Sequence, residues 1–434
     1  MFVISKPSGE VLDEFYFVNF LRWFMIGIDH TPYQLNGLSV ITSPFFYVFG
    51  DNWFSWRFPI VVLGMVFVYF FYKVAEKAFG KDTAIIASMI VCLSPTVFTH
   101  SGLMLRDVPV MAFGFIGLYM YLKKRYYLAF MIIGLSMMIK ETAILFAVFI
   151  VLHYVLANRQ ELMLSLHSKK FLTKHRILKT LACLGILTVS FLIPLTVYDN
   201  VVTVYEYETS KSQFSVVGKD KPIVFDPYLP PHALDEKFGP DGYYFANVNV
   251  VKDPIHHISV YFTKGQFQVI SGFEDSIWNS IIPGGSIGYH TNESKELHRT
   301  VLEDDGYFLH YYEFGVKRTQ SIIEIWWFVS FWMIAVFIPS SIFMNKKNMM
   351  NTSMLLIPAL LAFLVPFLII DEFRYTLSYY VIYYLPFMAL GMVLIIDHCI
   401  KNKNVKRIVY FGILLMMLCQ FVYEFPIQIT HEIF

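Results

Sequence analysis

Charged residues are scarce in this sequence of 434 residues. They make up 15% of the chain, whereas a soluble globular protein carries about 25%. The 34 basic and 33 acidic residues nearly cancel, to a net charge of +1, so the chain lacks the basic balance typical of nucleic-acid-binding proteins. We therefore expect no nucleic-acid partner, and the low charge content already argues against a soluble protein.

Cysteine is rare as well, with only four residues in the chain. Their spacing matches neither a metal site nor a paired disulfide framework, so a disulfide scaffold is excluded. All four lie in or beside apolar stretches, where we interpret them as packing residues: Cys92, Cys183, Cys399 and Cys419.

Apolar residues are abundant instead. They make up 56% of the chain, and 43 Phe and 28 Tyr add more apolar area than one soluble core can bury. A membrane-spanning helix needs about 20 mostly apolar residues. The sequence therefore predicts an all-α polytopic membrane protein with about 10–11 transmembrane helices, ten of them at 57–74, 83–99, 108–122, 128–139, 142–157, 180–198, 321–344, 353–370, 376–396 and 408–424.

Two of these spans, 128–139 and 142–157, are short, and Lys140 and Glu141 separate them. They are either two spans or one long helix with a buried charged pair. One long helix would reverse the direction of every later span, so the distribution of charge favours two spans.

Short loops rich in Lys and Arg mark the cytoplasmic side of a membrane protein. With ten alternating spans, one side receives 18 of the 34 basic residues and only four of the 33 acidic residues. The other side receives both termini and both long loops, which are therefore predicted to be extracytoplasmic. The modest size favours a cell membrane over the endoplasmic reticulum.

The chain divides into four predicted parts. Residues 1–56 form an extracytoplasmic first loop with amphipathic interfacial helices, and residues 57–198 form a six-helix membrane module. An extracytoplasmic loop of about 120 residues, 199–320, is long enough to be functional. Its segment 256–272 alternates enough to allow a strand pair. Residues 321–434 form a four-helix module.

The first twelve residues have neither the apolar core nor the cleavage site of a signal peptide. An extracytoplasmic N-terminus then requires either a preceding span that this sequence does not include or the translocation of residues 1–28 by themselves.

Acidic and basic residues gather at helix ends on the predicted extracytoplasmic side. Ionisable residues near membrane depth are costly and often mark substrate or ion pathways. Each group also has an ordinary structural interpretation, namely a helix cap, a solvated helix start, a snorkelling lysine or an aromatic-belt anchor. The functional interpretation rests on their occurring together: Asp13–Glu14, Arg106–Asp107, Lys140–Glu141 and Asp371–Glu372 with Arg374.

The sequence around these groups carries a family resemblance. It lies in four phrases in order along the chain, at 13–59, 73–107, 135–145 and 372–390. The first phrase contains DEFYF, a His-Thr-Pro element and FGDN followed by WRFP. This order resembles the polyprenyl-phosphate-sugar-dependent glycosyltransferases of the GT-C superfamily, above all the protein O-mannosyltransferase branch.

The resemblance implies a GT-C fold and transfer of a sugar, mannose in that branch, from a polyprenyl or dolichyl phosphate to a hydroxyl acceptor on protein or glycan. Such a reaction needs a base for the acceptor hydroxyl and cations for the departing phosphate. The candidate catalytic residues are Asp13 as base, Glu14 and Asp107. The candidates for the donor phosphate are Arg106, Lys140 and Arg374, and those for substrate are His30 and Tyr375.

No cofactor is expected, although a divalent cation held by Asp13, Glu14 and Asp107 stays an open alternative. Thr31 replaces the middle proline of the family's His-Pro-Pro element, and the lysine that usually follows this element is replaced around Asn36–Gly37. These departures bear on the acceptor more than on the fold.

Three other functions stay open. The acceptor of the same chemistry could be a lipid-linked glycan or a lipid A-like head group. A lipid transporter is disfavoured because the sequence shows neither internal repeats nor charges at mid-membrane. A non-catalytic scaffold that binds a partner through the long loop is the third.

Overall fold

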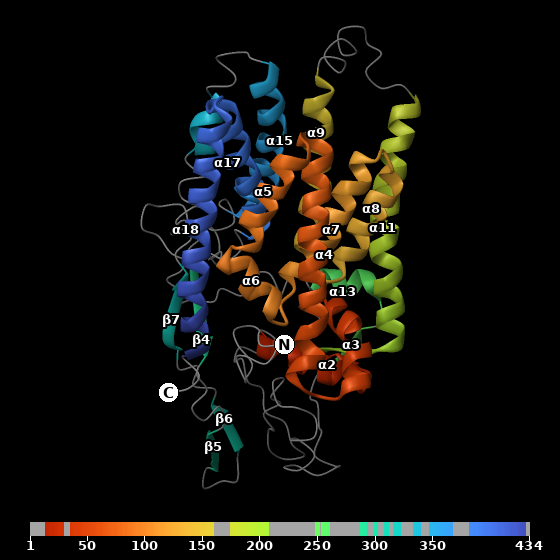
Figure 1. The fold of residues 1–434 in the computed structure, drawn as a ribbon. Helices are drawn as coiled ribbons and strands as arrows, with labels where there is room; N and C mark the ends of the chain where they lie inside the picture. The colour runs from red at the N-terminus through yellow and green to blue at the C-terminus, as the bar shows by residue number, and fades with distance from the viewer. Residues whose placement is uncertain are drawn as a thin grey trace.

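The computed structural model is a helical bundle with small strands at one end (Figure 1). It describes residues 14–29, 35–159, 174–207, 248–251, 253–260, 287–292, 299–302, 308–311, 316–322, 333–339, 347–367 and 382–430.

Three helices in the described part are long and apolar enough to cross a membrane. They are α4 (Trp53–Phe79), most of α11 (Lys174–Val201) and most of α18 (Lys403–Thr430). Six further apolar helices have 10–17 residues. These helices make the chain an integral membrane protein, and the membrane part is helical as predicted.

The predicted span 83–99 is wrong as a continuous helix. The structure has two helices there, α5 (Lys81–Cys92) and α6 (Pro95–Gly102), bent by 65° at the break. Ser94 caps α6 by accepting a hydrogen bond from the backbone of Val97, and Pro95 follows at the first helical position. A cap followed by proline starts a new helix, and this local signal ends the apolar run.

The break between the two short predicted spans is confirmed. Helix α8 (Tyr126–Met137) ends before Lys140, whose backbone is extended (φ −160°, ψ 138°). A 3-10 turn, η1 (Glu141–Ala143), then leads into α9 (Ile144–Ala157).

Helices that are distant in the chain pack side by side in the bundle. Helix α4 packs against α7 (Asp107–Leu122), α7 against α8, and α8 against α11. Helix α15 (Lys347–Phe363) contacts α9, and α17 (Leu385–Cys399) contacts α5 and α15. The ring of Phe115 on α7 lies at the centre of the core, against four rings on three other helices: Phe67, Phe71, Phe146 and Phe387.

Two short helices cover one end of this bundle, which we call the site end (Figure 1). They are α2 (Glu14–Met25) and α3 (Gly37–Phe49), where the sequence predicts amphipathic helices. Helix α2 buries one face because Phe17, Val18 and Leu21 repeat at helical spacing.

A three-stranded sheet joins the two long loops at the site end. Strand β1 (Ile28–Asp29) pairs in parallel with β2 (Thr203–Tyr207), and β2 pairs antiparallel with β3 (Val248–Val251). Helix α13 (Pro254–Val260) packs against α11. The first loop is therefore fixed to the segment that follows α11.

Two antiparallel pairs complete the described strands, β4 (Ile287–Asn292) with β7 (Val316–Ile322) and β5 (Arg299–Leu302) with β6 (Phe308–Tyr311). Two predictions are wrong in part. Residues 256–260 belong to helix α13 and not to a strand, because Pro254 starts a helical turn there, and residues 321–322 end β7 instead of beginning a span. Residues 261–272 of the predicted strand pair and 323–332 and 340–344 of the predicted span lie outside the described residues, and residues 333–339 are helical.

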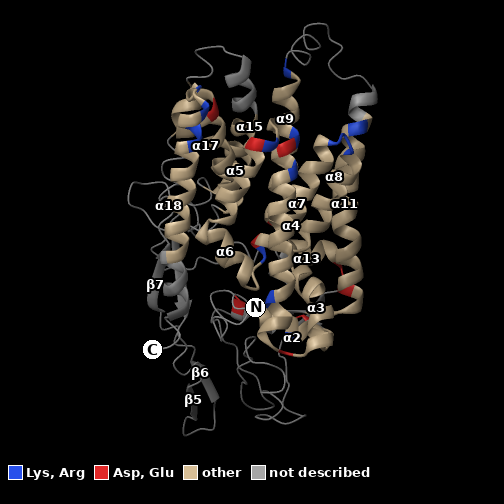
Figure 2. Ribbon diagram, in the orientation of Figure 1, with Lys and Arg blue, Asp and Glu red and all other residues tan. Residues whose placement is uncertain are grey.

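Blue and red mark mainly the ends of the helices in Figure 2, whose middle parts are tan. At the end opposite the site end, Asp397 of α17 accepts a hydrogen bond from Thr83 (3.1 Å) and forms an ion pair with Lys406 (2.7 Å). This contact joins α5, α17 and α18. The four-part division of the chain stays a prediction.

Candidate active site

Glu14 forms a buried ion pair with Arg57. The guanidinium donates from Nε to Oε1 (2.9 Å) and from Nη2 to Oε2 (2.6 Å), and both side chains are 0% exposed. The backbone amide of Met104 donates to the same Oε1 at 2.8 Å. The carboxylate of Glu14 therefore joins three elements, α2, α4 and the connection between α6 and α7.

That connection, residues 103–106, leads directly to Asp107 at the start of α7. The guanidinium of Arg106 lies 4.8 Å from the ring centroid of Phe17 on α2, a cation–π contact. Helix α2 thus holds the connection at two points, through Glu14 to Met104 and through Phe17 to Arg106. Its position fixes the point at which α7 begins.

Asp107 forms the second buried ion pair of the site end. Lys140 donates from Nζ to Oδ1 at 2.7 Å, and the two residues are 4% and 3% exposed. Two opposite charges can be buried together because each stabilises the other, whereas either alone costs several kcal/mol, of the order of 3 or more. Asp107 also lies at a helix N-terminus, where the helix dipole favours a negative charge.

Two hydroxyl groups extend this ion pair. Tyr383 donates to Oδ1 of Asp107 at 2.7 Å, and the hydroxyls of Tyr383 and Thr142 are 2.8 Å apart. We call Asp107, Lys140, Thr142 and Tyr383 the Asp107 cluster. Its members come from α7, the break after α8, η1 and the turn before α17, so the cluster ties three distant parts of the chain together.

Lys140 reaches Asp107 because the chain is not helical there. The extended backbone at Lys140 separates α8 from η1, and the break is braced by α3. The amide of Gly37 donates to the carbonyl of Met138 at 2.8 Å. A side chain at position 37 has no room, since a Cβ atom would lie 2.5 Å from that carbonyl oxygen.

A buried histidine lies near the cluster. His100 of α6 is fully buried, and its Nδ1 donates to the carbonyl of Thr96 at 3.0 Å. Tyr384, beside Tyr383, is also fully buried, but no hydrogen-bond partner for its hydroxyl is found in the described part of the chain.

The phrase FGDN with WRFP now has a structural explanation. Asp51 accepts hydrogen bonds from Arg22 of α2 (2.7 Å) and from the indole of Trp56 (3.0 Å). Asn52 caps α4 in a capping box with Ser55. With Arg57 bound to Glu14, the whole phrase fastens α2 to the start of α4.

A second polar junction lies at the end of α11. Tyr198 (2.8 Å) and Asn36 (2.7 Å) both donate to Oδ2 of the buried Asp29. The next residue, Asp199, lies 2.8 Å from Nδ1 of His257 on α13, and both are buried. The end of α11 thus binds the first loop through one residue and the second loop through the next.

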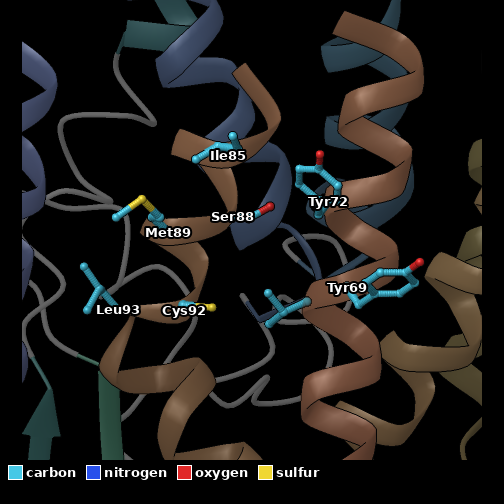
Figure 3. Close-up of a pocket in the computed structure, with 8 residues that line it drawn as sticks. Tyr69, Tyr72, Ile85, Ser88, Met89, Cys92 and Leu93 are labelled. Atoms are coloured by element: carbon cyan, nitrogen blue, oxygen red, sulfur yellow. The ribbon is translucent and has the colours of Figure 1, made fainter. Parts of the chain in front are cut away.

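An apolar groove of about 420 Å³ opens between α4 and α5 (Figure 3). Ser88 and Cys92 point from α5 toward α4 in this view. No member of the Asp107 cluster lines it, and its walls are apolar, as expected for a surface facing lipid tails: Val68, Tyr69, Tyr72, Ile85, Ser88, Met89, Cys92 and Leu93.

The structure brings four of the eight sequence-predicted site residues to the site end. Glu14 and Arg106 hold the start of α7, and Asp107 and Lys140 bind one another. The other four lie outside the described residues: Asp13, His30, Arg374 and Tyr375.

Sequence reasoning missed Arg57, Thr142 and Tyr383. Arg57 belongs to the WRFP phrase and Tyr383 to the phrase at 372–390, so the motifs could have identified both residues. The sequence could not identify their hydrogen-bond partners. Arg57 and Glu14 are 43 positions apart, and Tyr383 and Asp107 are 276 positions apart, so neither bond leaves a local pattern in the sequence. The described residues contain no group of three or more His, Cys, Asp or Glu that could hold a metal ion.

Comparison with known proteins gives a family match and matches among solved structures. Residues 37–192 match the family described as dolichyl-phosphate-mannose-protein mannosyltransferase. Among solved structures, the fold resembles the crystal structure of ArnT from Cupriavidus metallidurans in the apo state, with a TM-score of 0.50 and 11% sequence identity. No curated protein sequence matches the chain.

The likeness to ArnT covers 92% of this chain and 58% of ArnT, so the chain spans little more than half of that protein's length. The family match runs from α3 into α11 and includes Asp107 and Lys140. The chain is therefore similar to dolichyl-phosphate-mannose-protein mannosyltransferases over residues 37–192, and its fold is similar to that of ArnT.

Proposed function

We propose that the protein is a membrane glycosyltransferase that moves a sugar, mannose in the first instance, from a polyprenyl or dolichyl phosphate to a hydroxyl group of a protein or glycan. The buried Asp107–Lys140 pair at the start of α7 is the observation that carries this proposal. It places a carboxylate and a cation together at one end of a membrane bundle, inside the stretch that matches the mannosyltransferase family.

The reaction would be a single displacement. The acceptor oxygen attacks the anomeric carbon, the bond from that carbon to the phosphate oxygen breaks, and the lipid phosphate leaves with its electrons. The acceptor proton passes to a carboxylate, for which Asp13 is the candidate. Attack from the side opposite the phosphate inverts the anomeric centre.

Negative charge develops on the leaving phosphate in the transition state, and a nearby cation that stabilises this charge lowers the activation barrier. Lys140 is the described candidate, and Arg374 the second, outside the described residues. Lys140 already has an anionic partner at 2.7 Å, so a donor phosphate would share or take over its ammonium group. Asp107 would then be free to orient the sugar or the acceptor.

Glu14 and Arg106 have different proposed roles. Both oxygens of Glu14 are bound by Arg57 and one also by Met104, so we assign Glu14 to positioning α7. Arg106 is the third candidate for the phosphate. His30 follows directly on the buried Asp29, and we propose that it contacts the acceptor together with Tyr375.

The site end would face away from the cytoplasm, in a cell membrane. The bilayer, the lipid-linked donor and the acceptor are the proposed partners, and no cofactor is needed for the displacement. A lipid-linked or lipid A-like acceptor is the second candidate, because the described sheet of β1, β2 and β3, which includes segments of both long loops, lies at the same site end.

The test is transfer of radiolabelled mannose from dolichyl phosphate mannose by membranes that contain the wild type, Asp13→Asn, Asp107→Asn or the control Asp82→Asn. Asp82 is exposed at the opposite end of the bundle, at the start of α5. We expect label in product with the wild type and the control only, at matched protein abundance.

The labelled product would name the acceptor. Transfer that survives in Asp107→Asn would remove Asp107 from the mechanism. A wild type that transfers nothing from this donor or from other polyprenyl-phosphate sugars would contradict the proposed function and favour a scaffold.

A further inference from the structure

Within the Asp107 cluster, Tyr383 lies between the Asp107–Lys140 ion pair and the hydroxyl of Thr142. It is fully buried, its hydroxyl lies 2.7 Å from Oδ1 of Asp107 and 2.8 Å from the hydroxyl of Thr142, and its ring centroid is 6.0 Å from Nζ of Lys140. The ion pair and the two hydroxyls therefore form one continuous polar unit in an apolar core.

The direction of the hydrogen bonds follows from the charge on Asp107. An ionised carboxylate accepts hydrogen bonds and donates none, and the ion pair with Lys140 keeps Asp107 ionised. The single proton of the Tyr383 hydroxyl therefore points at Asp107. Its oxygen can then only accept from Thr142, so the chain runs one way, from Thr142 to Tyr383 to Asp107.

Both donors bind the same carboxylate oxygen. Lys140 and Tyr383 reach Oδ1, and the described residues provide no hydrogen bond to Oδ2. Rotation of the carboxylate would break two charge-assisted bonds at once. Oδ2 is thus held in one orientation, and no described residue competes with a substrate for it.

We infer that Tyr383, supported by Thr142, is a positioning residue that keeps Asp107 oriented when Lys140 turns to a donor phosphate. This inference rests on the proposed function. Without Tyr383, the withdrawal of Lys140 would leave a buried carboxylate with no donor on Oδ1 from the described residues, and Oδ2 would lose its fixed direction. Tyr383 keeps that bond in both states.

The chain offers a matched control in the neighbouring residue. Tyr384 is equally buried and equally large, but its hydroxyl has no hydrogen-bond partner among the described residues. Tyr383→Phe and Tyr384→Phe therefore remove the same atom from adjacent positions. Only the first change removes a bond to Asp107.

The experiment measures kcat and KM for dolichyl phosphate mannose with both variants in lipid nanodiscs. We expect Tyr383→Phe to lower kcat by about 10- to 100-fold, the effect of losing one hydrogen bond to a charged group at the reacting centre. The KM for the donor should change little, because Lys140 still binds the phosphate. Tyr384→Phe should match the wild type in both constants.

Thr142 supplies a second, independent pair of variants. Thr142→Val keeps the shape of the side chain but removes the donor to Tyr383, so kcat should fall, though less than in Tyr383→Phe. Thr142→Ser restores a hydroxyl and should restore kcat. This rescue depends on the hydroxyl and not on packing. The two Thr142 variants therefore still test the inference if Tyr383→Phe fails to fold.

Each outcome separates the inference from the proposed function. A wild type without transfer from any polyprenyl-phosphate sugar overturns the proposed function and, with it, the role of Tyr383. A wild type that transfers the sugar while Tyr383→Phe retains its kcat overturns the inference alone. So does an equal loss in both tyrosine variants, because that result reports packing.

Discussion

Glu14 and Arg57 form a fully buried ion pair, and neither charge has access to solvent. Two charge-assisted hydrogen bonds and the amide of Met104 satisfy the carboxylate. Removing one partner from such a pair leaves the other charged and buried, which is far more destabilising than the pair itself is stabilising.

We therefore predict that Arg57→Met lowers the free energy of unfolding by about 3–5 kcal/mol. The double variant Glu14→Met/Arg57→Met should recover much of this loss, because it leaves no buried charge. Both values come from denaturation of the purified protein in mixed micelles. A single variant as stable as the wild type would contradict the buried, charged state of Glu14.

Asp107 and a donor phosphate would compete for Lys140. Asp107→Asn removes the negative charge but keeps the size of the side chain, so it should release the ammonium group toward the ligand. We expect Asp107→Asn to bind dolichyl phosphate at least about fivefold more tightly than the wild type, while transfer is lost. Binding of radiolabelled dolichyl phosphate measures this.

Lys140→Met is the complementary variant, which should bind that phosphate more weakly than the wild type. Equal affinities in the three proteins would exclude Lys140 from the phosphate site.

At the scale of single residues, the sequence was informative about which charges matter but not about their partners. Charged residues at the ends of apolar segments identified Glu14, Asp107 and Lys140. The sequence placed Glu14 beside Asp13 in catalysis, whereas the structure binds Glu14 to Arg57. Tyr383 is one of 28 tyrosines, and only burial and a long-range hydrogen bond distinguish it.

The elements that carry the Asp107 cluster are held by close backbone contacts. Gly37 at the start of α3 lies against the break between α8 and η1, and its amide binds Met138. We predict that Gly37→Ala lowers the free energy of unfolding by about 1–3 kcal/mol, since the new methyl group overlaps a backbone carbonyl that cannot move away freely. Thermal unfolding in nanodiscs provides the measurement.

Gly185 is the control for this change. It lies inside α11, and a Cβ atom there meets nothing within 4 Å. Gly185→Ala should be neutral, or stabilising by up to about 1 kcal/mol from helix propensity. If Gly37→Ala is as stable as Gly185→Ala, then α3 does not brace the break.

Helices were predictable at the scale of elements because their apolar runs are long, and the break at Lys140 was predictable because two charges interrupt such a run. The bend between α5 and α6 was missed, although Ser94 and Pro95 mark it. The sheet at the site end was missed for another reason. Its strand β1 has two residues, and it pairs with a segment about 175 positions away, which no periodicity reveals.

At the scale of the whole molecule, the two ends of the bundle carry different structural elements. Helix α13 lies at the site end, and the turn between α17 and α18 lies at the opposite end with Asp397 and Thr83. We predict opposite accessibility for Ile255→Cys, which is 72% exposed on α13, and Asn402→Cys, which is exposed in that turn. The background is a variant in which the four native cysteines are replaced.

A membrane-impermeant maleimide should label Ile255→Cys in intact cells, and Asn402→Cys only after the cells are permeabilised. The basic residues predicted on the cytoplasmic side give this orientation. The reverse labelling would place the site end in the cytoplasm. It would then contradict the proposed use of a donor on the outer face.

The buried pair of Asp107 and Lys140 has a consequence for how the chain enters the membrane. Its two charges lie at the start of α7 and in the break that follows α8, so each of the two segments on its own carries an unneutralised ionisable group. Insertion of such a group costs up to about 3 kcal/mol at the middle of a helix and less toward its end. The two helices therefore gain from leaving the translocation machinery as a pair, and the short connection at 123–125 keeps them together during synthesis.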